Sequence, residues 1–326
     1  MARFFLFPAL VSLAILVAVF FWSGVAAFLT VAALSILEIT LSFDNAVVNA
    51  QVLKQMSPLW QKRFLTWGML VAVGGTRLVL PIFLVSLTAW VSPWLAVHLA
   101  FFDSAQYAVL ISGARYAIGA FGGAFLAMIS LRYFLDEGKT VHWIHAVERH
   151  LARWGDIEAL EIALVLGGVV VAALLAVSEA RSAILLAGVI GIVLSVGIES
   201  VMRALSVRGK GVAAGIGLFI YLNVLDSAFS LDGVVGAFAL TTSIPFIVIG
   251  LGIGAYFVRS LTLYLTEHKV LDSLVFIEHG AYWAIFGLAL SMFVGLVVEV
   301  PAFVTGLVGL LFMIAAYVSS VRATRS

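Results

Sequence analysis

Residues 26–52 read AAFLTVAALSILEITLSFDNAVVNAQV. A transmembrane helix needs about 20 mostly apolar residues, and this stretch is long enough to supply them. Two acids, Glu38 and Asp44, nevertheless lie inside it. An ionised side chain at the centre of a bilayer costs about 2.5 kcal/mol or more, so such residues mark functional sites. The stretch therefore predicts a membrane helix that contributes charged groups to a buried site.

The composition of the whole chain also indicates a membrane protein. Of 326 residues, 63% are hydrophobic and 11% are charged, whereas soluble domains carry about 25% charged residues. Within lipid, only helices and closed barrels satisfy the backbone polar groups, and long unbroken apolar runs favour helices over barrel strands. We expect an all-α polytopic membrane protein whose main partner is the lipid bilayer.

Charge and cysteine content exclude several classes of function. The net charge of +1 predicts no nucleic-acid partner, and the absence of cysteine excludes disulfides, thiolate metal sites and cysteine nucleophiles. No nucleotide-binding motif occurs, so we expect no ATP-driven step within this chain. The apolar run 4–22 is longer than a signal-peptide core of about 7–15 residues, and we expect it to be retained as a first span.

Ten apolar runs are long enough to be predicted membrane spans. They cover about 4–22, 26–52, 64–90, 115–135, 158–178, 183–203, 212–241, 245–267, 273–296 and 300–320. The stretch 91–114 is broken by Pro93 and Asp103 and is expected to be interfacial or re-entrant. With this count, 14 Lys and Arg residues fall on one side and 2 on the other. Because cytoplasmic loops carry the positive charge, both termini are predicted to be cytoplasmic.

Two of the predicted spans carry the same polar pattern. Residues 38–44 read EITLSFD and residues 226–232 read DSAFSLD, each with an acid at both ends and a serine in between; Arg77 and Arg259 follow, one in each next span. Spans two to four thus match spans seven to nine, five crossings apart and so in opposite directions. Such a 3+3 inverted repeat, with a site at its interface, is a recurring transporter plan.

This repeat divides a single predicted transmembrane domain, 1–326. The parts are repeat half 1 at 24–135, a cytoplasmic loop and two linking helices at 136–210, repeat half 2 at 211–296 and a C-terminal helix at 297–326.

The paired motifs predict a site for a positively charged guest. Four acids, Glu38, Asp44, Asp226 and Asp232, face two counter-charges, Arg77 and Arg259, which leaves about two negative charges for one divalent cation or two protons. The supporting polar residues are Ser42, Asn45, Asn49, Asn223 and Ser230. Oxygen ligands suit Mg²⁺, Ca²⁺ or Mn²⁺. Because the two acids of a motif lie about 120° apart on a regular helix, we expect each helix to be unwound near its serine.

Two histidine-containing segments allow alternative interpretations. Glu278 and His279 form either a proton-relay pair or an interface group at the cytoplasmic helix end. The loop with His142, His145 and His150 lacks the spacing of zinc proteases. We expect this loop to hold an amphipathic helix on the cytoplasmic surface, with a metal-sensing role as the alternative.

With these residues identified, the chain resembles the TerC family of the LysE/TerC transporter superfamily. The resemblance is carried by Leu37-Glu38-x-x-Leu41-Ser-x-Asp44-Asn45, by Asp226-x-x-Phe229-Ser-x-Asp232 and by Phe-Val-Arg259-Ser-Leu-Thr-Leu-Tyr264. It implies a manganese exporter in the bacterial cytoplasmic (inner) membrane. By position, the implied ion ligands are Glu38, Asp44, Asn45, Asp226 and Asp232. The chain departs from the family at Asn223, where a glutamate is common, so one charge is missing from the implied site.

The leading hypothesis is secondary-active export of a divalent cation, Mn²⁺ by resemblance, with protons as the coupling ion and no permanently bound cofactor. One alternative is export of a small organic cation or amino acid. Another is a metal-handling accessory membrane protein without net transport. An intramembrane aspartyl protease using Asp44 and Asp232 is disfavoured because no Gly-x-Gly-Asp segment occurs, so no enzyme is expected. The oligomeric state stays open.

Overall fold

The computed structural model describes residues 2–207, 212–238, 240–268, 270–298 and 300–325. These residues form helices joined by short turns, and no strand occurs among them. The chain divides into two compact units, one of Met1–Arg115 with Gly211–His268 and one of Tyr116–Lys210 with Lys269–Ser326. The predicted all-α class is confirmed.

The first unit contains the helices that precede residue 116 and those between residues 211 and 268. They are α1 (Ala2–Leu41), α2 (Phe43–Leu53), α3 (Pro58–Leu70), the π-helix η1 (Val71–Val79), α4 (Leu80–Thr88), α5 (Pro93–Phe102), the start of α6 (Ser104–Phe134), α10 (Val212–Ala237) and α11 (Ile244–Glu267).

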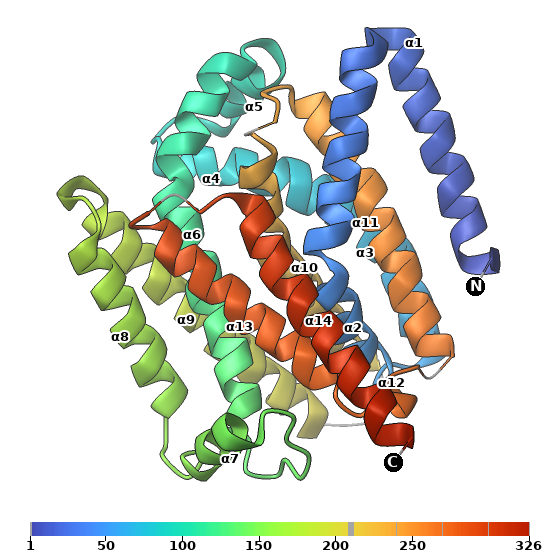
Figure 1. Ribbon diagram of the computed structural model, residues 1–326. Coiled ribbons are helices and arrows are strands. Elements are labelled where there is room, and N and C mark those ends of the chain that lie inside the picture. The colour runs from blue at the N-terminus through green and yellow to red at the C-terminus, as the bar shows by residue number, and fades with distance from the viewer. Residues whose placement is uncertain (1, 208–211, 239, 269, 299, 326) are drawn as a thin grey trace. The chain divides into compact units, whose positions relative to one another are not determined.

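Close packing of α1 along α11 organises this unit (Figure 1). Two glycines of α11 make it possible, since a Cβ at Gly250 would lie 2.5 Å from the Cβ of Leu34, and one at Gly254 would lie 2.5 Å from the Cβ of Glu38. Small residues one helical turn apart let membrane helices approach closely. The sequence of α11 thus positions the part of α1 that carries Glu38.

Helix α1 bends sharply at Gly24, where φ is 82° and ψ is −174°. This backbone conformation is essentially restricted to glycine. Figure 1 shows α1 as two rods that reverse direction at the bend. The bend falls between the predicted spans 4–22 and 26–52, so the two spans lie in different straight segments, one before Gly24 and one after it.

The predicted span 64–90 is built from three successive elements, α3, η1 and α4. The middle element is a nine-residue π-helix that contains Gly74, Gly75 and Arg77. π-helical segments are rare and frequently occur at functional sites. The change of helix type thus coincides with the only arginine of this span.

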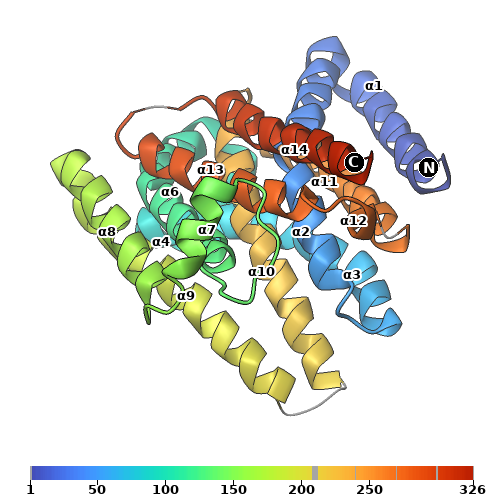
Figure 2. The same cartoon turned by 60° about the horizontal axis from the view of Figure 1, so that its bottom comes forward.

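The second unit contains the remaining helices. They are the rest of α6, α7 (His145–Arg153), α8 (Leu160–Leu175), the 3₁₀ turn η2 (Ser178–Ala180), α9 (Arg181–Val207), α12 (Val270–Ser273), α13 (Ile277–Gly295) and α14 (Ala302–Arg325). Helices α13 and α14 lie side by side (Figure 2). The loop after α6 contains the helix α7 where the sequence predicted one.

Eight helices in the described part of the chain are long and apolar enough to cross a membrane, which makes this a polytopic membrane protein. Phe4–Leu41 counts as one of the eight although it bends at Gly24. Leu160–Leu175 is apolar but shorter than these eight helices and is not one of them.

The prediction for the stretch 91–114 is corrected: only α5 is a separate short helix, and α6 begins at Ser104 rather than near 115. Asp103 causes the break, because its Oδ1 accepts a hydrogen bond from the Gln106 backbone N–H at the start of α6.

Candidate functional site

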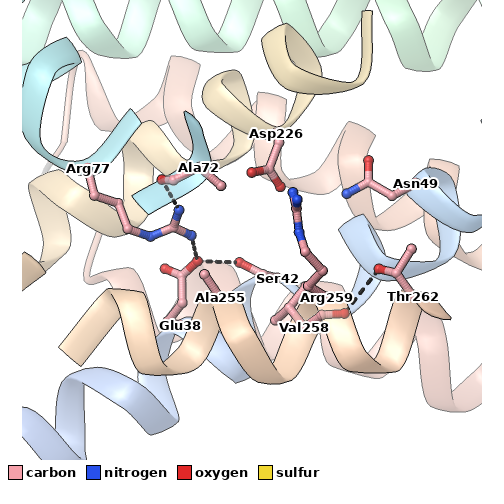
Figure 3. Close-up of a pocket in the computed structure, with 10 residues that line it drawn as sticks. All are labelled: Glu38, Ser42, Asn49, Ala72, Arg77, Asp226, Ala255, Val258, Arg259 and Thr262. Atoms are coloured by element: carbon pink, nitrogen blue, oxygen red, sulfur yellow. Dashed lines mark hydrogen bonds and ion pairs between the residues drawn. The ribbon is translucent and has the colours of Figure 1, made fainter. Parts of the chain in front are cut away.

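A polar pocket lies inside the first unit, between α1, α2, η1, α10 and α11 (Figure 3). It has room for about one water-sized guest. Its lining consists of Glu38, Ser42, Asn49, Ala72, Arg77, Asp226, Ala255, Val258, Arg259 and Thr262. The two predicted motifs therefore contribute one acid each to the same cavity.

Glu38 forms the most buried charged contact of the pocket. Its side chain and that of Arg77 form an ion pair and are 1% and 3% exposed. Ser42 Oγ donates a hydrogen bond to the same carboxylate oxygen, Oε1, at 3.0 Å. Arg77 Nη1 also donates to the backbone oxygen of Ala72 at 2.5 Å. The Arg77 guanidinium is thus shared between a carboxylate and a carbonyl, as Figure 3 shows.

The second oxygen of Glu38, Oε2, is buried and has no hydrogen-bond partner among the described residues. It lies beside Gly233 of α10, where a Cβ would be 3.1 Å away. A buried acceptor without a donor costs about 1–3 kcal/mol. Half of this carboxylate is therefore available to a positively charged guest.

Asp226 and Arg259 form the opposite part of the pocket. In Figure 3 the Asp226 carboxylate points toward the Arg259 guanidinium. Arg259 Nη1 donates to the backbone oxygen of Phe64 at 2.5 Å, and the guanidinium lies 4.2 Å from the centroid of the Phe64 ring. A Cβ at Gly68 would meet Arg259 Nη1 at 2.6 Å, so the glycine makes room for this arginine.

Four of the other predicted site residues, Asp44, Asn45, Asn223 and Ser230, do not line the pocket. Asp44 and Asn45 are buried at the start of α2, and the Asn45 backbone N–H donates to Asp44 Oδ1 at 3.0 Å. Asn223 donates from its amide to the Phe219 carbonyl at 2.7 Å. Ser230 is buried in α10. The side chain of Asp232 lies outside the part of the structure that is described.

Besides Glu38 Oε2, three buried side-chain oxygens of the motif region have no hydrogen-bond partner among the described residues: Asn45 Oδ1, Asn49 Oδ1 and Ser230 Oγ. Asn49 lines the pocket. Taken together, however, the described side chains include no group of three or more His, Asp or Glu residues that could hold a metal ion. The described site therefore joins Glu38 with Asp226, and not the full predicted ligand set.

The predicted unwinding occurs in one motif only. Helix α1 ends at Leu41 and α2 begins at Phe43, so Ser42 separates two helices. In the second motif, α10 continues without a break to Ala237, and the prediction is wrong there. The physical reason is packing: Gly233 gives Glu38 Oε2 the space beside a regular helix.

Residues 43–326 match a family described as a protein of unknown function, DUF475. The chain belongs to the DUF475 family. No curated protein and no solved structure matches it. Glu38 and Ser42 precede the matched residues, whereas Arg77, Asp226 and Arg259 lie within them. The DUF475 description names no activity, so the function has to be argued from the chemistry of the site.

The second unit of the DUF475 chain holds a buried acid that the sequence analysis missed. Glu148 of α7 is 0% exposed. Its carboxylate accepts hydrogen bonds from His279 Nδ1 at 2.8 Å and Trp283 Nε1 at 2.8 Å, and Lys139 Nζ lies 3.2 Å away. No periodicity marks this residue, because its partners come from a loop and from α13.

The surroundings of Glu148 determine its charge state. Burial by itself raises the pKa of the carboxyl, but the hydrogen bonds from His279 and Trp283 and the positive charge of Lys139 outweigh it and hold the pKa of Glu148 well below its usual range. In the same cluster, burial lowers the pKa of Lys139. His279, predicted as a relay partner of Glu278, is thus bonded to Glu148.

The histidine loop of the DUF475 chain forms no three-histidine group among the described residues. The rings of His142 and His145 are stacked with centroids 5.9 Å apart. His150 Nδ1 lies 2.6 Å from the carbonyl oxygen of Ala146 in its own helix. The metal-sensing role stays a prediction.

Proposed function

We propose that this DUF475 protein is a secondary-active exporter of a divalent metal cation, with the pocket between Glu38 and Asp226 as the binding site. One observation supports this above all. Carboxylates from two different helices line one cavity with room for a water-sized guest, inside a bundle whose composition is that of a membrane protein. A single dehydrated ion fits such a space.

The charges of the motif region favour a cationic guest. Arg77 is paired with Glu38 and Arg259 faces Asp226, which leaves the buried carboxyl of Asp44 with no ion pair among the described residues. The fourth acid of the two motifs adds to this excess. Uncompensated carboxylates are costly in lipid, so a guest cation or protons would stabilise the region.

The available ligands favour a hard cation. Glu38 Oε2 and Asn49 Oδ1 are buried oxygens without hydrogen-bond partners among the described side chains, and the Asp226 carboxylate lines the same pocket. Carboxylate and amide oxygens suit Mn²⁺, Mg²⁺ and Ca²⁺. The choice of Mn²⁺ within this group rests on the resemblance to the TerC family, as do Asp44, Asn45 and Asp232 as further ligands.

The proposal includes ten spans, a 3+3 inverted repeat and cytoplasmic termini in a bacterial inner membrane, with protons as coupling ions. The bend at Gly24, which separates two rods of α1, and the apolar helix Leu160–Leu175 support ten crossings. Each compact unit takes helices from both predicted repeat halves. We therefore expect the unit that carries the site, rather than a repeat half, to act as one body.

A specific observation favours the second candidate, export of an amino acid. The pocket presents two arginines and two acids, which is the charge pattern that a zwitterion would match. The size of the cavity argues for a single ion instead. An accessory role in metal handling would use the same ligands without net transport.

Transport by the purified full-length protein in proteoliposomes tests the proposal. Movement of Mn²⁺, Ca²⁺, Mg²⁺ and lysine should be compared for the wild type and for Glu38→Gln and Asp226→Asn. The matched control is Asp103→Asn, because Asp103 is exposed and lies outside the pocket. We expect Mn²⁺ transport in the wild type and the control and none in the two site variants. Lysine transport alone would favour the second candidate, and unchanged Mn²⁺ transport in both site variants would remove the site.

A further inference from the structure

Arg77 already occupies the position that a guest cation would take on one oxygen of Glu38. Its guanidinium is ion-paired with Glu38 Oε1, and both side chains are almost completely buried. Two like charges in contact with one buried carboxylate repel each other, and a divalent guest roughly doubles this repulsion. A guest cation and the guanidinium therefore compete for this carboxylate, and most directly for its Oε1.

We propose that Arg77 is a tethered counter-cation, which neutralises Glu38 while the site is empty and is displaced when the guest binds. This inference rests on the proposed function and adds to it how the site is regulated. The guest would first meet the unpartnered Oε2 of Glu38 and then take the place of the arginine at Oε1. In the empty protein the buried carboxylate is never left without a positive partner.

The attachment of Arg77 fits a side chain that moves. Its second anchor is the Ala72 carbonyl, on its own π-helix, so the guanidinium keeps one acceptor when it leaves Glu38. Its Nε has no hydrogen-bond partner among the described residues. The same π-helix contacts α10 through Thr76 Oγ1 and Ser227 Oγ, 2.9 Å apart, next in sequence to Asp226. A shift of Arg77 is thereby linked to the helix that carries the other acid.

Arg259 differs in each of these respects. It belongs to the regular helix α11, it is fixed by a hydrogen bond to the Phe64 carbonyl on another helix, and it packs on the Phe64 ring. These contacts fix its guanidinium from outside the pocket. Arg259 is therefore anchored by a neighbouring helix, whereas the anchor of Arg77 other than Glu38 lies on its own π-helix.

Equilibrium binding of Mn²⁺ to the full-length protein in lipid nanodiscs tests the inference. Arg77→Gln removes the competitor of the guest while it leaves Glu38 in place, so we expect Kd to fall about tenfold or more, which is about 1.4 kcal/mol of binding free energy. Arg77→Lys keeps the charge but loses the fork that matches a carboxylate, and should tighten binding by a smaller factor. Arg153→Gln, at an exposed arginine outside the pocket, is the control and should change Kd by less than about threefold.

Guanidinium ion supplies a second measurement. In Arg77→Ala, a cavity of guanidinium shape opens beside Glu38, so low millimolar guanidinium chloride should compete with Mn²⁺. It should not compete in the wild type, where the tethered side chain fills the space. Sodium chloride at equal concentration controls for ionic strength.

The outcomes separate the two proposals. Absence of Mn²⁺ binding in the wild type, or binding that Glu38→Gln leaves intact, overturns the proposed function. Binding that depends on Glu38 but is unchanged or weaker in Arg77→Gln overturns the displacement of Arg77 alone. If Arg77→Gln does not fold, Arg77→Lys decides, and unchanged or weaker binding in that variant overturns the inference.

Discussion

The free carboxylate oxygen of Glu38 lies against Gly233, so closely that a Cβ at residue 233 would be 3.1 Å from Oε2. This contact joins the two polar motifs, since Glu38 opens the first and Gly233 follows the last acid of the second. The buried oxygen has no hydrogen-bond partner among the described residues. The position of this oxygen depends on Gly233 of α10 having no side chain.

Gly233→Ala should therefore weaken cation binding. The added methyl group displaces the Glu38 carboxylate by a few tenths of an ångström, and we expect Kd for Mn²⁺ to rise about three- to tenfold, or about 0.7–1.4 kcal/mol. Titration of Mn²⁺ in nanodiscs measures the change. Gly167→Ala is the control, because nothing lies within 4 Å of a Cβ there, and an equal effect of both variants would refute the role of the contact.

Glu148 should contribute to the stability of the fold and not to transport. Glu148→Gln removes the charge from a fully buried carboxylate that is bonded to His279 and Trp283 and leaves Lys139 without its ion pair. Breaking a buried ion pair typically costs about 3 kcal/mol, and we expect a loss of this order in the free energy of unfolding. Glu158→Gln, at an exposed position, should leave stability unchanged.

The lowered pKa of Glu148 predicts that the stability of the folded protein depends on pH. Because the folded protein holds the pKa of Glu148 below its ordinary value of 4.5, its contribution to stability is present above that value and is lost as the pH falls through the folded pKa. Unfolding measured from about pH 6 down to about pH 2.5 should show a steeper loss of stability for the wild type than for Glu148→Gln. Parallel curves for the two proteins would contradict the assignment.

Gly24 should be intolerant of a side chain. Its combination of φ 82° and ψ −174° costs other residues about 1–3 kcal/mol, although a Cβ there would have open space around it. Gly24→Ala should reduce thermal stability by this amount. Gly113→Ala, also in open space but within a helix, should be neutral or slightly stabilising, and equal effects would mean that the backbone conformation is not the cause.

The sequence allowed the all-helical membrane class and the pairing of Glu38 and Asp226 in one region to be predicted, because both follow from where charges occur in apolar runs. The π-helix at Arg77 could not be predicted. It differs from an α-helix in its backbone hydrogen-bond partners, and this difference produces no recognisable pattern of apolar and polar residues in so short a segment. The continuous helix through Ser230 was missed because Gly233 serves packing against Glu38. The burial of Glu148 depends on contacts with residues far along the chain.

In the proposed exporter, Glu38 and Asp226 bind one guest cation together. Electron paramagnetic resonance of free Mn²⁺, titrated with the full-length protein in nanodiscs, counts the bound ions directly. We expect one bound Mn²⁺ per chain in the wild type, and we expect this ion to be lost in the Glu38→Gln, Asp226→Asn double variant. Equal binding by the wild type and the double variant would contradict it.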